Sequence, residues 1–90
     1  MYHLEYTTKF KREYKLVLKR GYKEALIQNV ISTIANNIPL AAKYKLHKLT
    51  GDYKDCWECH IQPDWLLIWQ INEETNTLIL TGTGTHSDLF

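Results

Sequence analysis

The 90-residue sequence contains no hydrophobic run that approaches the roughly 18 residues needed to span a membrane. It has no internal repeat, linker or low-complexity tract, and its N-terminus lacks the basic-then-apolar layout of a secretory signal. It has only two cysteines. We therefore expect a cytoplasmic protein with reduced thiols and no membrane partner. With 44% hydrophobic residues, residues 1–90 are expected to form one domain with a modest core.

Residues 55–90 contain no Lys or Arg, so the net charge of +1 conceals a strong asymmetry. All 11 basic residues lie in residues 1–54, where four acidic residues leave a net charge of +7. Residues 55–90 contain six acidic residues and carry −6. The basic half has two interpretations: the solvated faces of amphipathic helices, or a basic face that attracts nucleic-acid phosphate or an acidic partner.

The first half of the sequence predicts a strand followed by two helices. Alternating residues over 2–6 indicate a short half-buried strand, and Thr7 or Thr8 can cap the helix that follows. The apolar stripe of that helix consists of Phe10, Tyr14, Val17 and Leu18. Gly21 ends it, and a second helix is predicted over 23–36. The expected buried side of the second helix consists of Leu26, Ile27, Val30, Ile31 and Ile34.

The second half of the sequence predicts a long loop and three strands. Residues 39–52 show no clear period, and a loop of this length in a small domain is often functional. Strands are predicted over 55–61, 65–71 and 77–83, joined by a proline turn and a polar loop. The order β-α-α-β-β-β predicts an α+β fold, in which an antiparallel-rich sheet carries a helical hairpin on one face.

The sequence Cys56-Trp57-Glu58-Cys59-His60 matches the C-x-x-C-H spacing of haem attachment and contains the C-x-x-C of thiol redox proteins. In a strand, however, residues three apart point to opposite faces. We therefore interpret Cys59 as a small buried hydrophobe and Cys56 as a partly exposed thiol. A zinc site built from a cysteine and several histidines is conceivable, but the spacing matches no compact ligand pattern. We predict neither a metal nor a cofactor.

Three of the four histidines lie in or beside irregular segments: His47, His60 and His86. Histidine suits acid–base catalysis near neutral pH, because both of its protonation states are populated there. Metal-free RNA cleavage requires one group to take a proton from the 2′-OH and another to protonate the departing 5′ oxygen. His60 shares a predicted strand face with Glu58, and Asp64 follows across the turn.

Each of these residues also has an ordinary structural interpretation. A histidine beside a turn is usually a polar surface residue, and Asp64 after a proline is usually a turn former. Trp65 is more often a core residue than a stacking platform, and Phe90 is more often a packing plug. The residue pattern alone therefore does not favour catalysis, and His3 is interpreted as a surface residue.

Three segments occur in this order: residues 44–51 (YKLHKLTG), 58–65 (ECHIQPDW) and 83–90 (TGTHSDLF). Together they resemble the YafQ family of bacterial toxins, which belongs to the RelE/ParE superfamily. The resemblance covers nearly the whole chain, because the order of predicted elements fits it as well. Three motifs in the right order make the match specific, whereas H-x-x-P-D alone would not.

The resemblance implies a ribosome-dependent endoribonuclease toxin that needs no metal and cleaves messenger RNA in the decoding site. It implies 2′-OH attack leaving a 2′,3′-cyclic phosphate, and neutralisation by a cognate antitoxin, often of the DinJ type. The family's catalytic positions fall on His47, His60, Asp64 and His86. His60 and His86 are the expected proton-transfer pair in either order, Asp64 orients one of them, and His47 is a third proton or phosphate group.

The resemblance also implies residues that contact the substrate. Trp65 and Phe90 match the aromatic positions that place the base or backbone, and Glu58 matches an acidic position before the strand histidine. The sequence departs from the family at Trp57, where many relatives carry Arg. The missing cationic contact to phosphate is expected to come from one of two nearby lysines, Lys48 or Lys54.

Two other functions compete with RNA cleavage. ParE-type toxins of the same superfamily act without catalysis by binding a protein target such as gyrase, and the C-x-x-C-H motif leaves a haem or thiol redox module open. ParE-type members do not need a set of histidines. His47, His60 and His86 therefore favour the nuclease.

Overall fold

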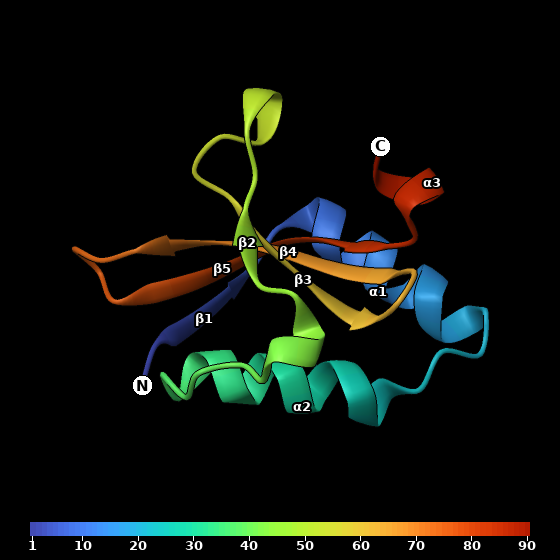
Figure 1. The fold of residues 1–90 in the computed structure, drawn as a ribbon, viewed down its shortest axis with the longest axis horizontal. Coiled ribbons are helices and arrows are strands. Elements are labelled where there is room, and N and C mark those ends of the chain that lie inside the picture. The colour runs from blue at the N-terminus through green and yellow to red at the C-terminus, as the bar shows by residue number, and fades with distance from the viewer.

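A five-stranded sheet with the order β1-β5-β4-β3-β2 lies at the centre of the computed structural model, which describes residues 1–90 (Figure 1). The strands are β1 His3–Tyr6, β2 His47–Lys48, β3 Trp57–Gln62, β4 Trp65–Asn72 and β5 Thr77–Gly84. β1 runs parallel to β5, and the other neighbouring pairs are antiparallel. The α+β fold and the antiparallel-rich sheet are confirmed. β2 is an additional strand inside the segment that was predicted to be a loop.

Two helices cover one face of the sheet: α1 Thr8–Lys19 and α2 Glu24–Ala35. Thr7 caps α1 as predicted, because its hydroxyl oxygen accepts a hydrogen bond of 3.0 Å from the Phe10 amide. Gly21, at φ +92°, turns the chain out of α1 in a conformation that favours glycine. None of the helices is both long and apolar enough to cross a membrane.

The larger core lies between these helices and the side of the sheet that we call the helix face. β4 contributes Trp65, Leu67 and Trp69 to it, and β3 contributes Cys59 and Ile61. The helices add the predicted stripes, with Ile27, Val30, Ile31 and Ile34 buried in α2. Two predicted residues are exceptions: Leu18 is only partly buried and lies outside this core, and Leu26, at 37% exposed, lies at its rim.

A second, smaller core lies on the opposite side of the sheet, which we call the histidine face. It consists of Cys56, Leu66, Ile68 and Leu89. Two segments cover it: the part of the loop around the short helix η2 Gly51–Tyr53, and a C-terminal helix, α3 His86–Leu89. The other short helix of the loop, η1 Ala42–Tyr44, packs Tyr44 against the helix-face core instead. The tail after β5 is therefore helical, which the sequence analysis did not predict.

The two cysteines of the C-x-x-C-H motif lie in different cores. Cys59 belongs to the helix-face core and Cys56 to the histidine-face core. Burial raises the pKa of the Cys59 thiol to about 12. Cys56 is 7% exposed, so its predicted partial exposure is wrong: β3 begins at Trp57, and the residue before it turns inward against β4. This separation across the sheet contradicts a dithiol redox site.

β1 also differs from its prediction. All four residues of this strand are exposed, although alternation indicated a half-buried strand. β1 is an edge strand that pairs only with β5, and Leu4 and Tyr6 are 37% and 43% exposed. Side-chain alternation therefore predicted the strand correctly, but not its exposure to solvent.

The difference between Leu26 and Ile27 gives a test of the helix-face core. Ile27→Ala should lower the free energy of unfolding by about 2–5 kcal/mol, because it leaves a cavity at a fully buried position. Leu26→Ala is the matched control, and it should cost less than about 1 kcal/mol at its partly exposed position. Urea denaturation measures both. Equal losses would contradict this orientation of α2.

Candidate active site

Three histidines from separate segments form a row on the histidine face. His47 comes from β2, His60 from β3 and His86 from α3. The ring centroids of His47 and His60 are 6.2 Å apart, and those of His60 and His86 are 5.7 Å apart. Pairing of β2 with β3 sets His47 opposite Glu58, two residues before His60. All three histidines predicted from the sequence are thus brought together, and we call them the histidine row.

His47 is held through both of its ring nitrogens. Its Nε2 lies 3.0 Å from Glu58 Oε1, and its Nδ1 lies 2.7 Å from the Lys45 carbonyl oxygen. A carbonyl and a carboxylate only accept hydrogen bonds. His47 and Glu58 are therefore either an imidazolium beside a carboxylate, or a neutral imidazole whose Nε2 accepts a hydrogen bond from a protonated carboxyl group. In both cases neither ring nitrogen of His47 has a free lone pair. His47 is therefore poorly suited to be a general base.

Glu58 is buried, at 4% exposed, and its second oxygen, Oε2, has no hydrogen-bond partner. The prediction that Glu58 contacts substrate is therefore wrong, because it lies beneath His47 rather than at the surface. Its position opposite β2 makes it the group that orients the His47 ring. A buried carboxylate that keeps one unpaired oxygen is costly, so its retention is consistent with a role in the site.

His60 has a simpler environment. Its Nδ1 lies 3.2 Å from the carbonyl oxygen of Pro63, in the two-residue turn between β3 and β4. Since that carbonyl only accepts, the neutral ring carries its proton on Nδ1. Nε2 then keeps its lone pair, and no protein group occupies it.

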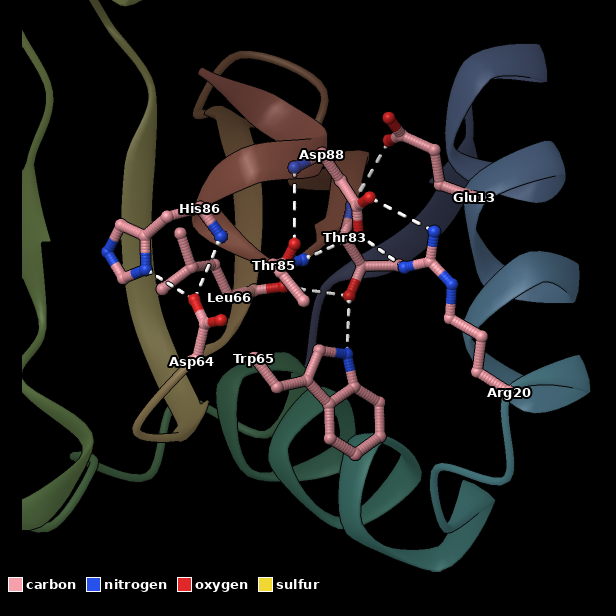
Figure 2. Close-up of polar contacts among 9 residues, drawn as sticks. All are labelled: Glu13, Arg20, Asp64, Trp65, Leu66, Thr83, Thr85, His86 and Asp88. Carbon is pink, nitrogen blue, oxygen red and sulfur yellow. Dashed lines mark hydrogen bonds and ion pairs between the residues drawn. The ribbon is translucent and has the colours of Figure 1, made fainter.

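His86 is paired with Asp64 (Figure 2). The carboxylate oxygen Oδ1 lies 2.6 Å from His86 Nδ1 and accepts a 3.0 Å hydrogen bond from the His86 backbone amide. These two contacts, the backbone one first, hold the pKa of Asp64 below its usual range. A carboxylate at Nδ1 stabilises the imidazolium and leaves the proton on Nε2 available to a substrate.

Trp65 is not at the surface of the site. It is 1% exposed, its ring meets Tyr22 edge-on at 5.0 Å, and its Nε1 donates a 2.9 Å hydrogen bond to Thr83 Oγ1. The Thr83 hydroxyl in turn donates to the Leu66 carbonyl at 2.7 Å. The prediction that Trp65 places a base or backbone is therefore wrong, because this residue points to the helix face. It instead locks the start of β4 to the end of β5.

The two lysines expected to replace the family's Arg differ in position. Lys48 follows His47 in β2, so it points to the helix face, where its Nζ lies 5.2 Å from the centroid of the Trp57 ring. Its phosphate contact stays a prediction for an exposed side chain that lies on the face opposite the histidine row. Trp57 lies on the same face, so an Arg there would also point away from the histidine row. Lys54 is exposed on the loop before β3, and its phosphate contact stays a prediction.

Phe90 is 59% exposed and meets the Tyr53 ring edge-on at 5.1 Å. Tyr53 also donates a 3.1 Å hydrogen bond to the Leu89 carbonyl. The exposed ring of Phe90 is accessible to a substrate, whereas Leu89 is buried in the histidine-face core. Removal of both tail residues would therefore cost stability as well as any contact that Phe90 makes.

Several residues that hold the site together were not predicted from the sequence: Arg20, Tyr53, Thr83, Thr85 and Asp88. One local signal was available, because Thr85-x-x-Asp88 is a capping-box pattern that marks the start of a helix. The others depend on contacts between distant segments. No group of three or more His, Cys, Asp or Glu side chains is arranged to hold a metal ion. The conceivable zinc set of histidines with a cysteine is therefore not assembled.

A cavity of about 590 Å³ lies away from the histidine row. It lies on the helix face, between the segment that follows α2 and the strands β3 and β4. None of the three histidines lines it. The geometry of the side chains, rather than the size of a cavity, therefore identifies the candidate active site.

Comparison with known proteins gives one consistent answer. Residues 2–90 match the family model described as the bacterial toxin of type II toxin–antitoxin system, YafQ. The chain is 34% identical over 88 residues to the mRNA interferase toxin YafQ of Escherichia coli K12, covering 97% of this chain and 94% of the relative. It is 32% identical over 89 residues to a putative toxin YafQ of Haemophilus influenzae, covering 93% of this chain and 87% of the relative.

Solved structures agree. A metal-bound toxin from Helicobacter pylori superposes with a TM-score of 0.94 and 43% identity, over 100% of both chains. The toxin in the Escherichia coli DinJ-YafQ complex superposes with a TM-score of 0.90 and 33% identity, over 100% of this chain and 99% of the other. The family model and the relatives both span nearly the full length of this chain. The chain therefore belongs to the YafQ family of bacterial type II toxin–antitoxin toxins.

Proposed function

We propose that this protein is a ribosome-dependent endoribonuclease that cleaves messenger RNA during translation. The observation that carries the proposal is the histidine row, in which His60 keeps a free Nε2 and His86 is paired with Asp64. Relatives named mRNA interferases support the same activity. A ParE-like toxin that only binds a protein target would not require three histidines with separate polar partners.

The environments of the histidines support a division of the proton work. His60 acts as the general base: its free Nε2 takes the proton from the 2′-OH, whose oxygen then attacks the adjacent phosphorus. His86 acts as the general acid and donates its Nε2 proton to the departing 5′ oxygen, while Asp64 stabilises the imidazolium. The bond between phosphorus and the 5′ oxygen breaks. The products are a 2′,3′-cyclic phosphate and a 5′-hydroxyl.

The remaining site residues have supporting roles. His47, fixed by Glu58 and the Lys45 carbonyl, provides an oriented ring beside His60 that helps place the phosphate or stabilise its charge. Phe90 offers an exposed aromatic face to a base or to the ribose backbone. Lys54 supplies a cation near the loop that covers the histidine face.

Dependence on the ribosome is supported by the charge of the N-terminal half. α1 exposes four cations on the side away from the sheet: Lys11, Arg12, Lys15 and Lys19. Such a stripe attracts the phosphates of ribosomal RNA. The same charge suits an acidic segment of an antitoxin, and a DinJ-type partner is proposed because a related YafQ forms such a complex.

Substitution of the proposed base and acid tests the nuclease directly. His60→Ala and His86→Ala should each lower single-turnover cleavage on programmed ribosomes by about 10²–10⁴-fold, the usual contribution of a general acid or base. Messenger RNA ends mapped after induction should lose the cleavage sites seen with the wild type. His3→Ala is the control, because His3 is exposed on β1. Intact transcripts under the wild type, or undiminished toxicity of both variants, would refute the proposal.

The pH dependence separates the histidines from Asp64. The pKa of Asp64 is lowered, so its carboxylate is charged throughout the range in which histidines titrate, and its contact with His86 is lost only as pH falls through that lowered value. Cleavage should therefore vary between about pH 5 and 8 through histidine titration alone. Asp64→Asn should lower the maximal rate, because the His86 ring loses the carboxylate at its Nδ1. A flat profile with rate-limiting chemistry would contradict this assignment.

Metal independence needs its own measurement, because a related toxin has been crystallised with bound metal. Toxin treated with EDTA and then dialysed should cleave messenger RNA on ribosomes at the untreated rate. The Mg²⁺ of the ribosome buffer is kept constant in both samples. Loss of activity that is restored by added zinc or copper would show that the histidine row works through a metal instead.

A further inference from the structure

We propose that Arg20 and Asp88 are a positioning pair that holds the tail helix α3 against the sheet and so sets the place of His86. The inference rests on the proposed function, because it assigns the pair to placing the general acid. Arg20 follows α1 and lies 68 residues from Asp88 in sequence. Neither residue has been assigned a part in the cleavage chemistry.

α3 needs external support. It has four residues, far fewer than a helix requires to be stable by itself in water. Leu89 anchors one side of it in the histidine-face core, and Tyr53 donates a hydrogen bond to the Leu89 carbonyl. Both contacts hold the end of α3. The first turn, which carries His86, is held by Asp64 and by Asp88.

The carboxylate of Asp88 takes part in two interactions at once, the capping box of α3 and the ion pair with Arg20 (Figure 2). Its Oδ2 accepts a 2.9 Å hydrogen bond from the Thr85 amide, and the Asp88 amide donates a 3.2 Å bond to Thr85 Oγ1, which together form the capping box of α3. Arg20 donates hydrogen bonds to the same carboxylate from two nitrogens, with Nη1 at 2.6 Å from Oδ2 and Nη2 at 3.1 Å from Oδ1. This bidentate geometry fixes the orientation of the Asp88 carboxylate as well as its distance from Arg20.

The backbone before α3 is shaped to receive this carboxylate. Gly84 has φ +155°, and a Cβ atom at this position would lie 2.9 Å from Asp88 Oδ2. α1 reaches the same segment at a second point, because the Thr83 amide donates a 3.2 Å hydrogen bond to Glu13 Oε1. The end of β5 and the start of α3 therefore form hydrogen bonds with α1 and Arg20 on one side and with Asp64 on the other.

Arg20 does not reach the histidine row itself. In Figure 2 it approaches Asp88 from the α1 side, whereas His86 faces Asp64 on the opposite side of the tail. Both terminal nitrogens of Arg20 lie on Asp88. The ion pair is partly exposed, and such pairs contribute little to global stability. Loss of the pair should therefore disturb the placement of His86 more than it disturbs the fold.

A double-mutant cycle tests the pair. Arg20→Gln and Asp88→Asn, which keeps an oxygen acceptor for Thr85, should each slow single-turnover cleavage by about 10–100-fold, the cost of misplacing a catalytic group by about 1 Å. The double variant should be no slower than either single variant. The toxin concentration that gives half-maximal rate should not change. Arg20→Lys should recover part of the rate, and Lys23→Gln is the control for the loss of one exposed charge close to Arg20 in the sequence.

Measurements on the free protein identify the cause. In Arg20→Gln and Asp88→Asn, the His86 amide should exchange faster with solvent, and the pKa of Asp64 followed by ¹³C NMR should rise toward its usual range as it loses the His86 contacts. Loss of the Asp88 charge by itself would lower that pKa, so a rise in Asp88→Asn reports the lost contacts. Melting temperatures should stay close to that of the wild type. These readouts need no RNA, so they test the positioning role even if the wild type proves not to cleave messenger RNA.

Three results would overturn the inference. A slow Arg20→Gln variant beside an unaffected Asp88→Asn variant would show that Arg20 contacts RNA directly. Additive losses in the double variant would show that the two residues act separately. An unchanged Asp64 titration and an unchanged His86 amide in both single variants would show that α3 keeps its place without the pair.

Discussion

The candidate site depends on the burial of β4 from both sides. Residues 65–69 of this strand are each at most 2% exposed, and they lie between β3 and β5. Alternate side chains of β4 pack either against the helices or against the loop and tail. A shift of one residue in the register of β4 would therefore exchange the side chains that face the two sides of the sheet. The same register with β3 decides which face carries Glu58 and His60. Packing of the core and placement of the histidines are therefore one constraint.

Local periodicity was enough to predict most of the fold. The helices α1 and α2 and the strands β3 to β5 were predicted to within a few residues, because their apolar spacing is visible within each segment. β2 was missed because a two-residue strand has no period and exists only through its pairing with β3. α3 is too short to show a helical stripe. The exposure of β1 depends on its place at the sheet edge, which no local pattern reports.

The family motifs identified which residues gather at the site but not how each one is oriented. Lys48 and Trp65 were assigned to the substrate, yet both point to the helix face. For Lys48 the cause is simple alternation with His47 in β2. For Trp65 the cause is again alternation, because its neighbour Leu66 is the residue of β4 that pairs with His60 and shares its face. A position close to a histidine in a motif therefore does not place a side chain on the same face of the sheet.

The three residues of the histidine row have the same side chain, and they differ in the groups that contact their ring nitrogens. His47 and His86 each face a carboxylate, from Glu58 and Asp64, whereas His60 between them faces only a carbonyl oxygen. The middle ring is therefore the one with a free lone pair and no neighbouring anion. In the proposed mechanism this difference separates base from acid. It arises from the proline turn, the β2–β3 pairing and the fastened tail, which lie far apart in the sequence and meet only in the fold.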